Sequence, residues 1–199
     1  MFLISLLVRI KARCPKIWTV LERLNGAGFG IFYARKFRKG VEDAMSCIDS
    51  SEFLFRFLNL HDTTELMALL ASIEPDLSNF FEPHAFSKEA IQKQLQNKAF
   101  FMMGVFREEK LVGYFFLRLG INKKCFVGRY IHPDYRNRGI GKKMNQIMYT
   151  TAWQTGFRVY ATLSKENHLV VQSHQNNPHI RYINPLEDGY WLVEFVELN

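Results

Sequence analysis

Hydrophobic residues alternate with polar ones through the middle of the chain, and this alternation predicts a series of strands. Residues 53–59 alternate around three phenylalanines and predict a first strand. Residues 99–107 and 111–119 are rich in Phe, Met, Val and Leu, and the charged turn 108–110 joins them into a hairpin. Residues 125–131 are β-branched and aromatic, so they predict the strand after the hairpin.

Beyond residue 139 the hydrophobic spacing becomes helical. An amphipathic helix that stops at Gly156 is predicted by the recurrence of Ile140, Met144, Ile147, Met148 and Ala152. The remaining patterns predict helices near 61–72, capped by Asp62 or Thr63, near 87–96, capped by Ser87, and over 165–175, and strands at 157–163, 180–184 and 190–197. This order implies one α/β domain with a mixed sheet and helices on both faces. With 199 residues, 48% of them hydrophobic, the chain can bury a full core.

Between the strand at 125–131 and the long helix lies the segment His132–Lys143, which reads HPDYRNRGIGKK. A glycine turn that opens a helix forms an anion site, because the first helical turn has unpaired N–H groups and a positive dipole end. Lys142 and Lys143 stand where that dipole disfavours cations, and Arg136 and Arg138 precede them. This arrangement indicates a polyanionic ligand, and the alternative is a solvated basic turn.

Two common phosphate motifs do not fit this chain. Gly141-Lys142 is followed by Lys143 where a P-loop has Ser or Thr. Residues 25–30, NGAGFG, superficially resemble a dinucleotide fingerprint, but Ile31 occupies the position of the third glycine and no clear strand precedes it. Residues 25–30 are therefore predicted to form a flexible turn, with cofactor binding as the weaker alternative.

The stretch from Tyr130 to Lys143, with its Arg-x-x-Gly-x-Gly pattern, resembles motif A of the GCN5-related N-acetyltransferases, the GNAT superfamily. The order of elements from Phe53 to Val196 is similar to the family as well. The resemblance implies the GNAT fold, a central mixed and mostly antiparallel sheet whose splayed middle strands admit acetyl-CoA as cosubstrate. It implies that the cofactor is bound by Tyr130, Ile131, Arg136, Asn137, Arg138, Gly139, Ile140, Gly141, Lys142 and Asn167. Asn167 is equally well explained as a helix N-cap.

The resemblance further implies direct acetyl transfer to an amine, with the backbone at Tyr130 and Ile131 facing the thioester. The family's usual acid, a tyrosine, falls on His174 here, which can itself donate a proton or be an ordinary polar residue. Tyr182 and Tyr149 are weaker alternatives. Glu82 or His84 is expected to act as the general base or to hold the substrate. The alternative is that both belong to an ordinary surface loop before the helix cap Ser87.

The segment Phe81–Phe86 looks like some family members associated with surface-polysaccharide synthesis, which implies a small amine acceptor such as an amino sugar. The competing function is a noncatalytic acyl-CoA sensor or interaction module that keeps the fold.

The net charge of +7 is concentrated at the N-terminus. Residues 1–41 contain nine basic residues and one acid, Glu22, whereas the rest of the chain has 17 basic and 18 acidic residues. Residues 1–50 are therefore predicted to be a basic extension, and residues 51–199 the acetyltransferase domain. The first eight residues of the extension, MFLISLLV, are too few to span a bilayer, and no basic region precedes them as in a signal peptide.

Three readings of this extension stay open: peripheral contact with an anionic membrane, an amphipathic helix packed on the domain, or a natural start nearer Met45. Nucleic-acid binding is disfavoured, because no recognition module accompanies the basic residues. The three widely spaced cysteines suggest neither a disulfide framework nor a metal site, so a cytoplasmic protein without a metal is expected, as a monomer or a homodimer.

Overall fold

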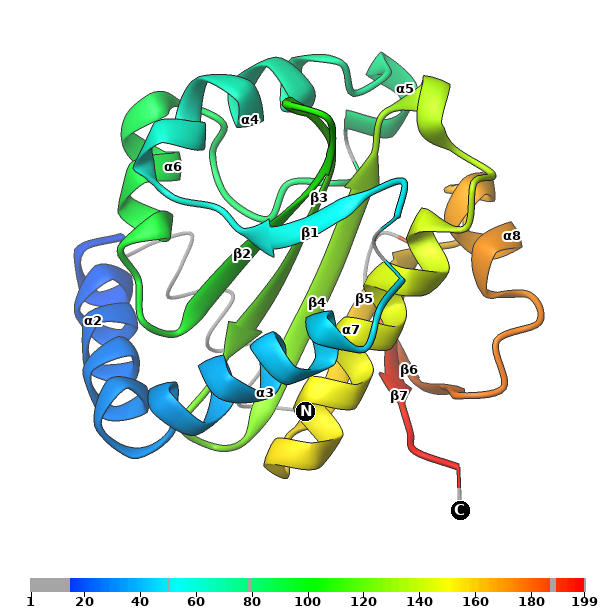
Figure 1. Cartoon of the computed structure of the whole chain (residues 1–199). Helices are drawn as coiled ribbons and strands as arrows, with labels where there is room; N and C mark the ends of the chain where they lie inside the picture. The colour runs from blue at the N-terminus through cyan, green and yellow to red at the C-terminus, as the bar shows by residue number, and fades with distance from the viewer. Residues whose placement is uncertain (1–14, 50, 79, 187–188, 199) are drawn as a thin grey trace.

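A single seven-stranded sheet forms the centre of the computed structural model, which describes residues 15–49, 51–78, 80–186 and 189–198 (Figure 1). The strand order is β1-β2-β3-β4-β5-β7-β6, and only the β4–β5 pair is parallel. The strands are β1 Leu54–Phe57, β2 Phe100–Arg107, β3 Lys110–Leu119, β4 Lys124–Ile131, β5 Arg158–Ser164, β6 Ile180–Pro185 and β7 Tyr190–Phe195. The expected mixed, mostly antiparallel sheet is confirmed.

Helices cover both faces of this sheet. They are α2 Pro15–Phe32, α3 Ala34–Ser46, α4 Thr63–Ala71, α5 Pro75–Ser78, α6 Lys88–Leu95, α7 Ile140–Thr155 and α8 His168–His174, with 3₁₀ turns η1 Leu60–Asp62 and η2 Pro133–Tyr135. Two of the predicted helix ends have the expected capping residue, whereas Asp62 precedes α4 without a side-chain cap because its carboxylate pairs with Arg56. The Ser87 hydroxyl accepts a hydrogen bond from the Ala90 N–H, and Gly156 ends α7 in the left-handed conformation with φ of 83°.

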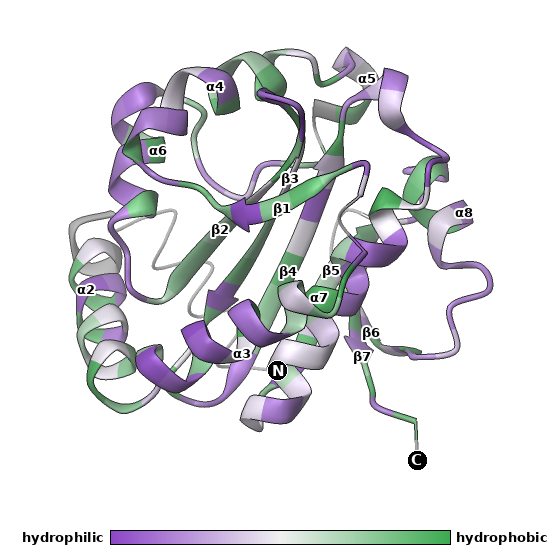
Figure 2. Cartoon of the chain, in the orientation of Figure 1, coloured by the Kyte–Doolittle hydropathy of each residue, from purple (hydrophilic) through white to green (hydrophobic). Residues whose placement is uncertain are grey.

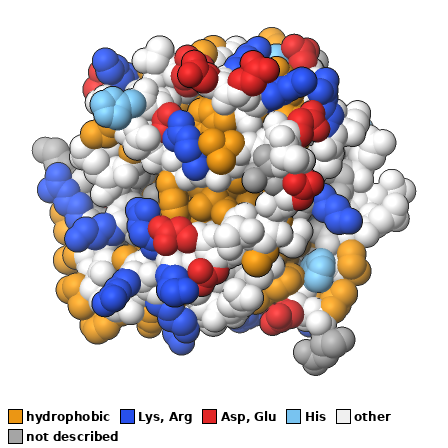
Figure 3. Space-filling view, in the orientation of Figure 1, with side chains coloured by type: hydrophobic (Ala, Val, Ile, Leu, Met, Phe, Trp, Pro, Cys, Tyr) orange, Lys and Arg blue, Asp and Glu red, His pale blue; other side chains and the backbone are white. Residues whose placement is uncertain are grey.

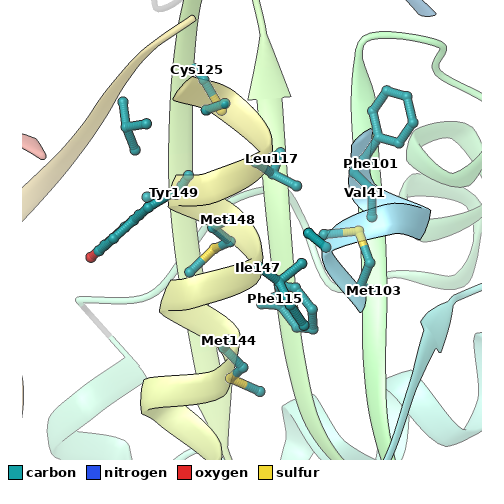
Figure 4. Packing of buried hydrophobic residues seen from close by; sticks show 14 of the residues in the cluster. Val41, Phe101, Met103, Phe115, Leu117, Cys125, Met144, Ile147, Met148 and Tyr149 are labelled. Carbon is teal, nitrogen blue, oxygen red and sulfur yellow. The ribbon is translucent and has the colours of Figure 1, made fainter. Parts of the chain in front are cut away.

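Alternate residues along the strands supply two separate cores, since successive side chains point to opposite faces. On β2, Phe101 and Met103 belong to the core under α3 and α7, whereas Phe100 and Met102 belong to the core under α4 and α6. Figure 4 shows the first core, in which Met144, Ile147 and Met148 of α7 point at the sheet. Figure 2 shows the matching hydropathy pattern, with hydrophobic strands inside and more hydrophilic helix surfaces outside.

Helices α2 and α3 share the first core with the rest of the chain. Phe29 of α2 and Phe37 and Val41 of α3 are fully buried, and the Phe37 ring lies 5.2 Å from that of Phe157 beside β5. Residues 15–49 therefore pack as part of one unit with the sheet, so residue 50 marks a change of charge but no break in packing. The first fourteen residues, including the apolar run 1–8, lie outside the described residues.

The prediction of a flexible turn at residues 25–30 is wrong, because these residues lie in the second half of α2. Asn25 binds both sides of the β3–β4 turn: its amide donates to the Leu119 carbonyl at 2.8 Å and its oxygen accepts from the Ile121 N–H at 3.0 Å. A β-carbon at Gly28 would lie 3.1 Å from the Ile121 side chain. The glycines thus serve close helix packing, which the sequence pattern could not reveal. Among the described helices, none is both long and apolar enough to cross a membrane.

Candidate active site

The predicted anion loop forms a turn of alternating handedness between η2 and α7. Asn137 and Gly139 have φ of 61° and 76°, both left-handed, and α7 begins directly afterwards at Ile140. Within the part of the chain that the structure describes, the N–H groups of residues 137–141 have no hydrogen-bond acceptor. Consecutive free amides in such a nest, at the positive end of a 16-residue helix, form an anion-binding concavity.

The basic side chains around this loop differ in how they are engaged. Arg136 forms an ion pair with Glu74, which follows α4, and its Nε lies 3.4 Å from the Ile131 carbonyl. Arg138 reaches the Asp134 carbonyl and a more distant Glu52 carboxylate at 3.7 Å. The Lys142 side chain is exposed. Part of the positive charge is therefore neutralised by neighbouring carboxylates, and part is available to a ligand.

Strands β4 and β5 diverge below this loop. They pair only from Lys124 to Phe126 on β4, although β4 continues to Ile131. The His132 N–H donates to Val112 on β3, and the backbone groups of a strand alternate in direction. Even-numbered residues of β4, including Tyr130, therefore face β3, while the backbone groups of Arg129 and Ile131 face the opening. The predicted splay is present, and Ile131 but not Tyr130 directs its backbone into it.

Arg129 lies beside this opening on the α7 side of the sheet and is mostly buried. A β-carbon at Gly141 would lie 3.3 Å from its Nε, and Tyr149, two turns further along α7, interacts with it electrostatically. No hydrogen bond or ion pair joins its guanidinium to any other described residue. Burial lowers the pKa of Arg129 from its ordinary value, yet a guanidinium remains charged.

Asn145 adds an unsatisfied acceptor to the same surface of α7. Gly141, Asn145 and Tyr149 are spaced by four residues and so share one face of the helix. The Asn145 Oδ1 is buried and has no hydrogen-bond partner, the one such side-chain atom among the described residues. Arg129 lies close to Gly141 and Tyr149, which flank Asn145 along this face, so the cation and the unpaired acceptor are on the same side of the sheet.

His174 belongs to this α7 side. Its ring lies 5.2 Å from that of Phe195, and its Nδ1 is 3.1 Å from the Asn177 amide nitrogen. Burial, with a further contribution from the Arg129 charge, lowers the pKa of His174 to about 4. The imidazole is consequently neutral at pH 7, which limits it as an acid there.

His84 lies on the opposite face, against the second core. It is buried, with Nδ1 2.9 Å from the Ala85 carbonyl and Nε2 3.1 Å from the hydroxyl of Tyr114. These contacts assign the proton to Nδ1 and make Nε2 the acceptor. Burial lowers the pKa of His84, so this imidazole is also neutral, and both of its nitrogens are occupied.

The segment containing Glu82 lies over the unpaired part of β4. The Phe81 ring is 6.0 Å from that of Tyr130 and would be 3.5 Å from a β-carbon at Gly128. The Tyr130 hydroxyl donates to the Ser72 carbonyl at 2.8 Å, which fixes its ring under α4. The Glu82 side chain, next to Phe81, is exposed. An exposed carboxylate thus belongs to the segment that covers this part of β4.

The other predicted residues have simpler environments. Asn167 is the N-cap of α8, and its Oδ1 accepts from the Val170 N–H at 3.1 Å. Tyr182 is exposed on the edge strand β6. Tyr149 is buried beside Arg129, and burial raises its pKa. No group of His, Cys, Asp and Glu within the described chain has the arrangement of a metal site.

The structure therefore gathers the predicted loop residues at one end of β4 but separates the catalytic candidates. His174 lies on the α7 face, whereas Glu82 and His84 lie on the α4 face, and the opening between β4 and β5 lies between them. Sequence reasoning missed Arg129, Asn145 and Glu74. The signal for Arg129 was a charge at a position of β4 that shares the inward register of Cys125 and Val127.

This fold and loop are those of the GNAT acetyltransferases. The model of the acetyltransferase (GNAT) family matches residues 65–176, more than half of the sequence, and the chain belongs to this family of acyltransferases. No curated protein sequence matches the chain.

Solved structures give the same fold at low sequence identity. The PaiA N-acetyltransferase of Thermoplasma acidophilum, solved in complex with coenzyme A, is 16% identical, with a TM-score of 0.62 over 72% of this chain and 98% of that protein. RimL, a ribosomal L7/L12 α-N-protein acetyltransferase, is 15% identical, with a TM-score of 0.61 over 75% and 92%. YncA of Salmonella typhimurium, solved with its cofactor acetyl-CoA, is 13% identical, with a TM-score of 0.56 over 73% and 91%. At these identities the likeness establishes the fold alone.

Proposed function

We propose that this protein is an acetyl-CoA-dependent N-acetyltransferase that transfers the acetyl group directly to the primary amine of a small acceptor. The observation that carries the proposal is the continuity between the β4–β5 opening and the free amides of residues 137–141. A strand opening followed by an anion nest suits a long cofactor with a pyrophosphate at one end. The coenzyme A complexes of PaiA and YncA, which share the fold, support the same assignment.

On the donor side, the amides of residues 137–141 would bind the pyrophosphate, with Arg138 and Lys142 adding charge. The pantetheine would follow the backbone of Arg129 and Ile131, which faces the opening. Asn167 supports α8 as its cap, and its role toward the cofactor is indirect. These residues hold the thioester at the end of β4 and leave the α4 face to the acceptor.

In the transfer step, the neutral amine nitrogen forms a bond to the thioester carbon, the C–S bond breaks, coenzyme A leaves as a thiolate, and the nitrogen releases its extra proton to solvent. The Ile131 N–H is placed to stabilise the oxyanion that develops on the carbonyl. Glu82 would accept the ammonium proton before attack, because its carboxylate is exposed near the opening whereas both nitrogens of His84 are engaged. His84 then acts as a positioning residue that holds Tyr114.

The leaving thiolate requires either a proton or a positive charge. His174, with a pKa of about 4, supplies little protonated imidazole at pH 7. Arg129 lies beside it as a partly buried cation without a carboxylate partner among the described residues. A guanidinium in such low-dielectric surroundings would stabilise the thiolate electrostatically. Arg129 therefore takes over the role expected of the family's tyrosine, with His174 as its neutral neighbour.

The assignment of the donor loop is tested by coenzyme A binding to two matched variants. Gly139→Asp and Gly156→Asp place the same charge at opposite ends of α7, and each glycine has a left-handed φ with no heavy atom within 4 Å of an added β-carbon. At a free coenzyme A concentration of about one hundred times Kd, the free energy of unfolding of the wild type and of Gly156→Asp should rise by about 2.7 kcal/mol. Their Tm should rise by roughly 5–10 °C. Gly139→Asp should abolish the rise through charge repulsion. Equal rises in both variants would overturn the loop assignment.

Catalysis is tested by release of free thiol from acetyl-CoA with nucleotide-linked amino sugars, polyamines and amino acids as acceptors. Turnover with an amine supports the enzyme, and an amino sugar as the best acceptor would support the narrower assignment. Coenzyme A binding without turnover on any amine would instead favour a noncatalytic acyl-CoA sensor.

A further inference from the structure

Helix α2 presents apolar residues outward as well as inward. Phe29 is buried in the first core, and two polar residues also face the protein: the Glu22 carboxylate pairs with Arg118 at 2.7 Å, and Asn25 hydrogen-bonds the β3–β4 turn. The outward side of α2 carries Val20, Leu24 and Ile31, which are 53%, 64% and 78% exposed. A surface helix normally has polar residues on the side opposite its buried stripe.

The outward residues form one continuous stripe. Val20, Leu24, Ala27 and Ile31 are spaced by four, three and four residues, and Ala27 is exposed like the others. Phe32, 73% exposed, borders the stripe at the end of the helix. A contiguous exposed apolar surface of this kind marks an interaction site.

The neighbouring helix α3 has the usual arrangement, with apolar residues on its buried side and charged residues outside. Phe37, Val41 and Ala44 of α3 are buried, and its charged residues, including Arg35 and Lys36, are exposed. Figure 3 shows hydrophobic side chains along the edge of the molecule that α2 occupies, with Lys and Arg side chains close by. The apolar stripe is thus bordered by cations.

The charge around the stripe selects its occupant. Residues 1–41 contain one acid, Glu22, and that carboxylate is already paired with Arg118. A second copy of the chain would place like charges against each other. So would the chain's own first residues, which carry Arg9, Lys11 and Arg13. An anionic lipid surface accepts both the apolar side chains and the cations.

We propose that α2 lies on an anionic membrane surface, with its apolar stripe at the boundary between headgroups and acyl chains. Arg23, Arg35 and Lys36 would contact the lipid phosphates. Asn25 fixes α2 to the β3–β4 turn, whereas the anion loop follows the far end of β4 (Figure 1). Membrane contact would therefore leave the proposed donor site open, and each can be tested without the other.

The experiment is flotation of the full chain with vesicles of phosphatidylcholine alone or with 30% phosphatidylglycerol, a composition chosen at roughly the charge of anionic membranes. The wild type should float with the anionic vesicles only, and less at high salt. Leu24→Glu with Ile31→Glu should reduce binding at least tenfold. Leu60→Glu with Leu198→Glu, which adds the same charge at exposed residues elsewhere, should bind like the wild type.

Three results would overturn the proposal. The first is equal flotation of both double variants, or none of the wild type. The second is a dimer that Leu24→Glu with Ile31→Glu converts to a monomer, which would identify a second copy as the occupant. The third is flotation that appears only after Leu6 and Leu7 are replaced by Glu, which would mean that the first residues cover α2. The coenzyme A thermal shift should be the same in all variants, so failure here is distinct from failure of the proposed function.

Discussion

The two faces of the central sheet each hold a buried histidine, and their surroundings differ. His84, on the α4 face, has a hydrogen-bond partner at each ring nitrogen, the Ala85 carbonyl and the Tyr114 hydroxyl. His174, on the α7 face, packs on Phe195 and lies next to the uncompensated charge of Arg129. The first is held by satisfied hydrogen bonds, whereas the second is kept neutral by burial and a neighbouring cation.

This difference shows why a histidine near a cleft is a weak guide to catalysis. An acid or base works best when its pKa lies near the working pH and one nitrogen can reach the substrate. The pKa of His174, about 4, fails the first condition for an acid at pH 7, and His84 lacks a free nitrogen. The proposed mechanism therefore assigns the chemistry to an exposed carboxylate on one face and a partly buried guanidinium on the other.

The largest expected difference between the two faces is in acid stability. The folded pKa of His174, about 4, is below the unfolded value of 6.5, so the unfolded chain binds more protons between these values. His174 therefore has no effect on the pH dependence above pH 6.5, and it lowers the free energy of unfolding by about 3 kcal/mol as the pH falls to 4. His174→Gln should remove this part of the slope in urea denaturation curves.

His84→Gln is the matching variant on the α4 face. The pKa of His84 is lowered in the same direction, so its replacement should also reduce the loss of stability in acid. A His174→Gln curve that runs parallel to the wild type from pH 7 to pH 4 would contradict the burial of a neutral imidazole.

The next effect concerns turnover on the α4 face. Glu82→Gln should lower kcat/KM for the amine about a hundredfold, the lower range for loss of a general base, with no change in coenzyme A affinity. His84→Gln can still accept a hydrogen bond from Tyr114, and it should lower kcat/KM less than tenfold. The reverse order of the two variants would make His84 the base, and it would require its hydrogen bond with Tyr114 to open during catalysis.

The smallest expected effect is on coenzyme A affinity, through the ion pair beside the proposed donor loop. Glu74→Gln removes the carboxylate paired with Arg136, and the released guanidinium should raise coenzyme A affinity about threefold at low salt. The gain should shrink at 0.5 M salt, because exposed charges are screened. Glu65→Gln, at an exposed residue of α4, is the matched control and should leave the affinity unchanged. A weaker affinity in Glu74→Gln would show that Glu74 instead positions Arg136 for the phosphate.

Local patterns were sufficient for most elements of the fold. Hydrophobic spacing and turn residues predicted the strands at 99–107, 111–119 and 125–131 and the helix from Ile140 to Gly156. These segments bury their apolar side chains at regular intervals, so the pattern is visible in the sequence. The prediction of a turn at residues 25–30 was wrong because their glycines accommodate the β3–β4 turn, which is nearly a hundred residues away in sequence. The side chains of the site were harder to predict, since Glu74, Arg129 and Asn145 come from three separate elements.

The sequence by itself was sufficient to predict the anion loop, which we propose binds the donor. A glycine turn between a strand and a helix builds its anion site from consecutive backbone amides, so its chemistry is local. Only the tertiary structure decided which side chains accompany it, because burial and pairing depend on neighbours distant in sequence. In the tertiary structure His174 is buried and neutral beside Arg129, both nitrogens of His84 have partners, and an apolar stripe of α2 stays exposed.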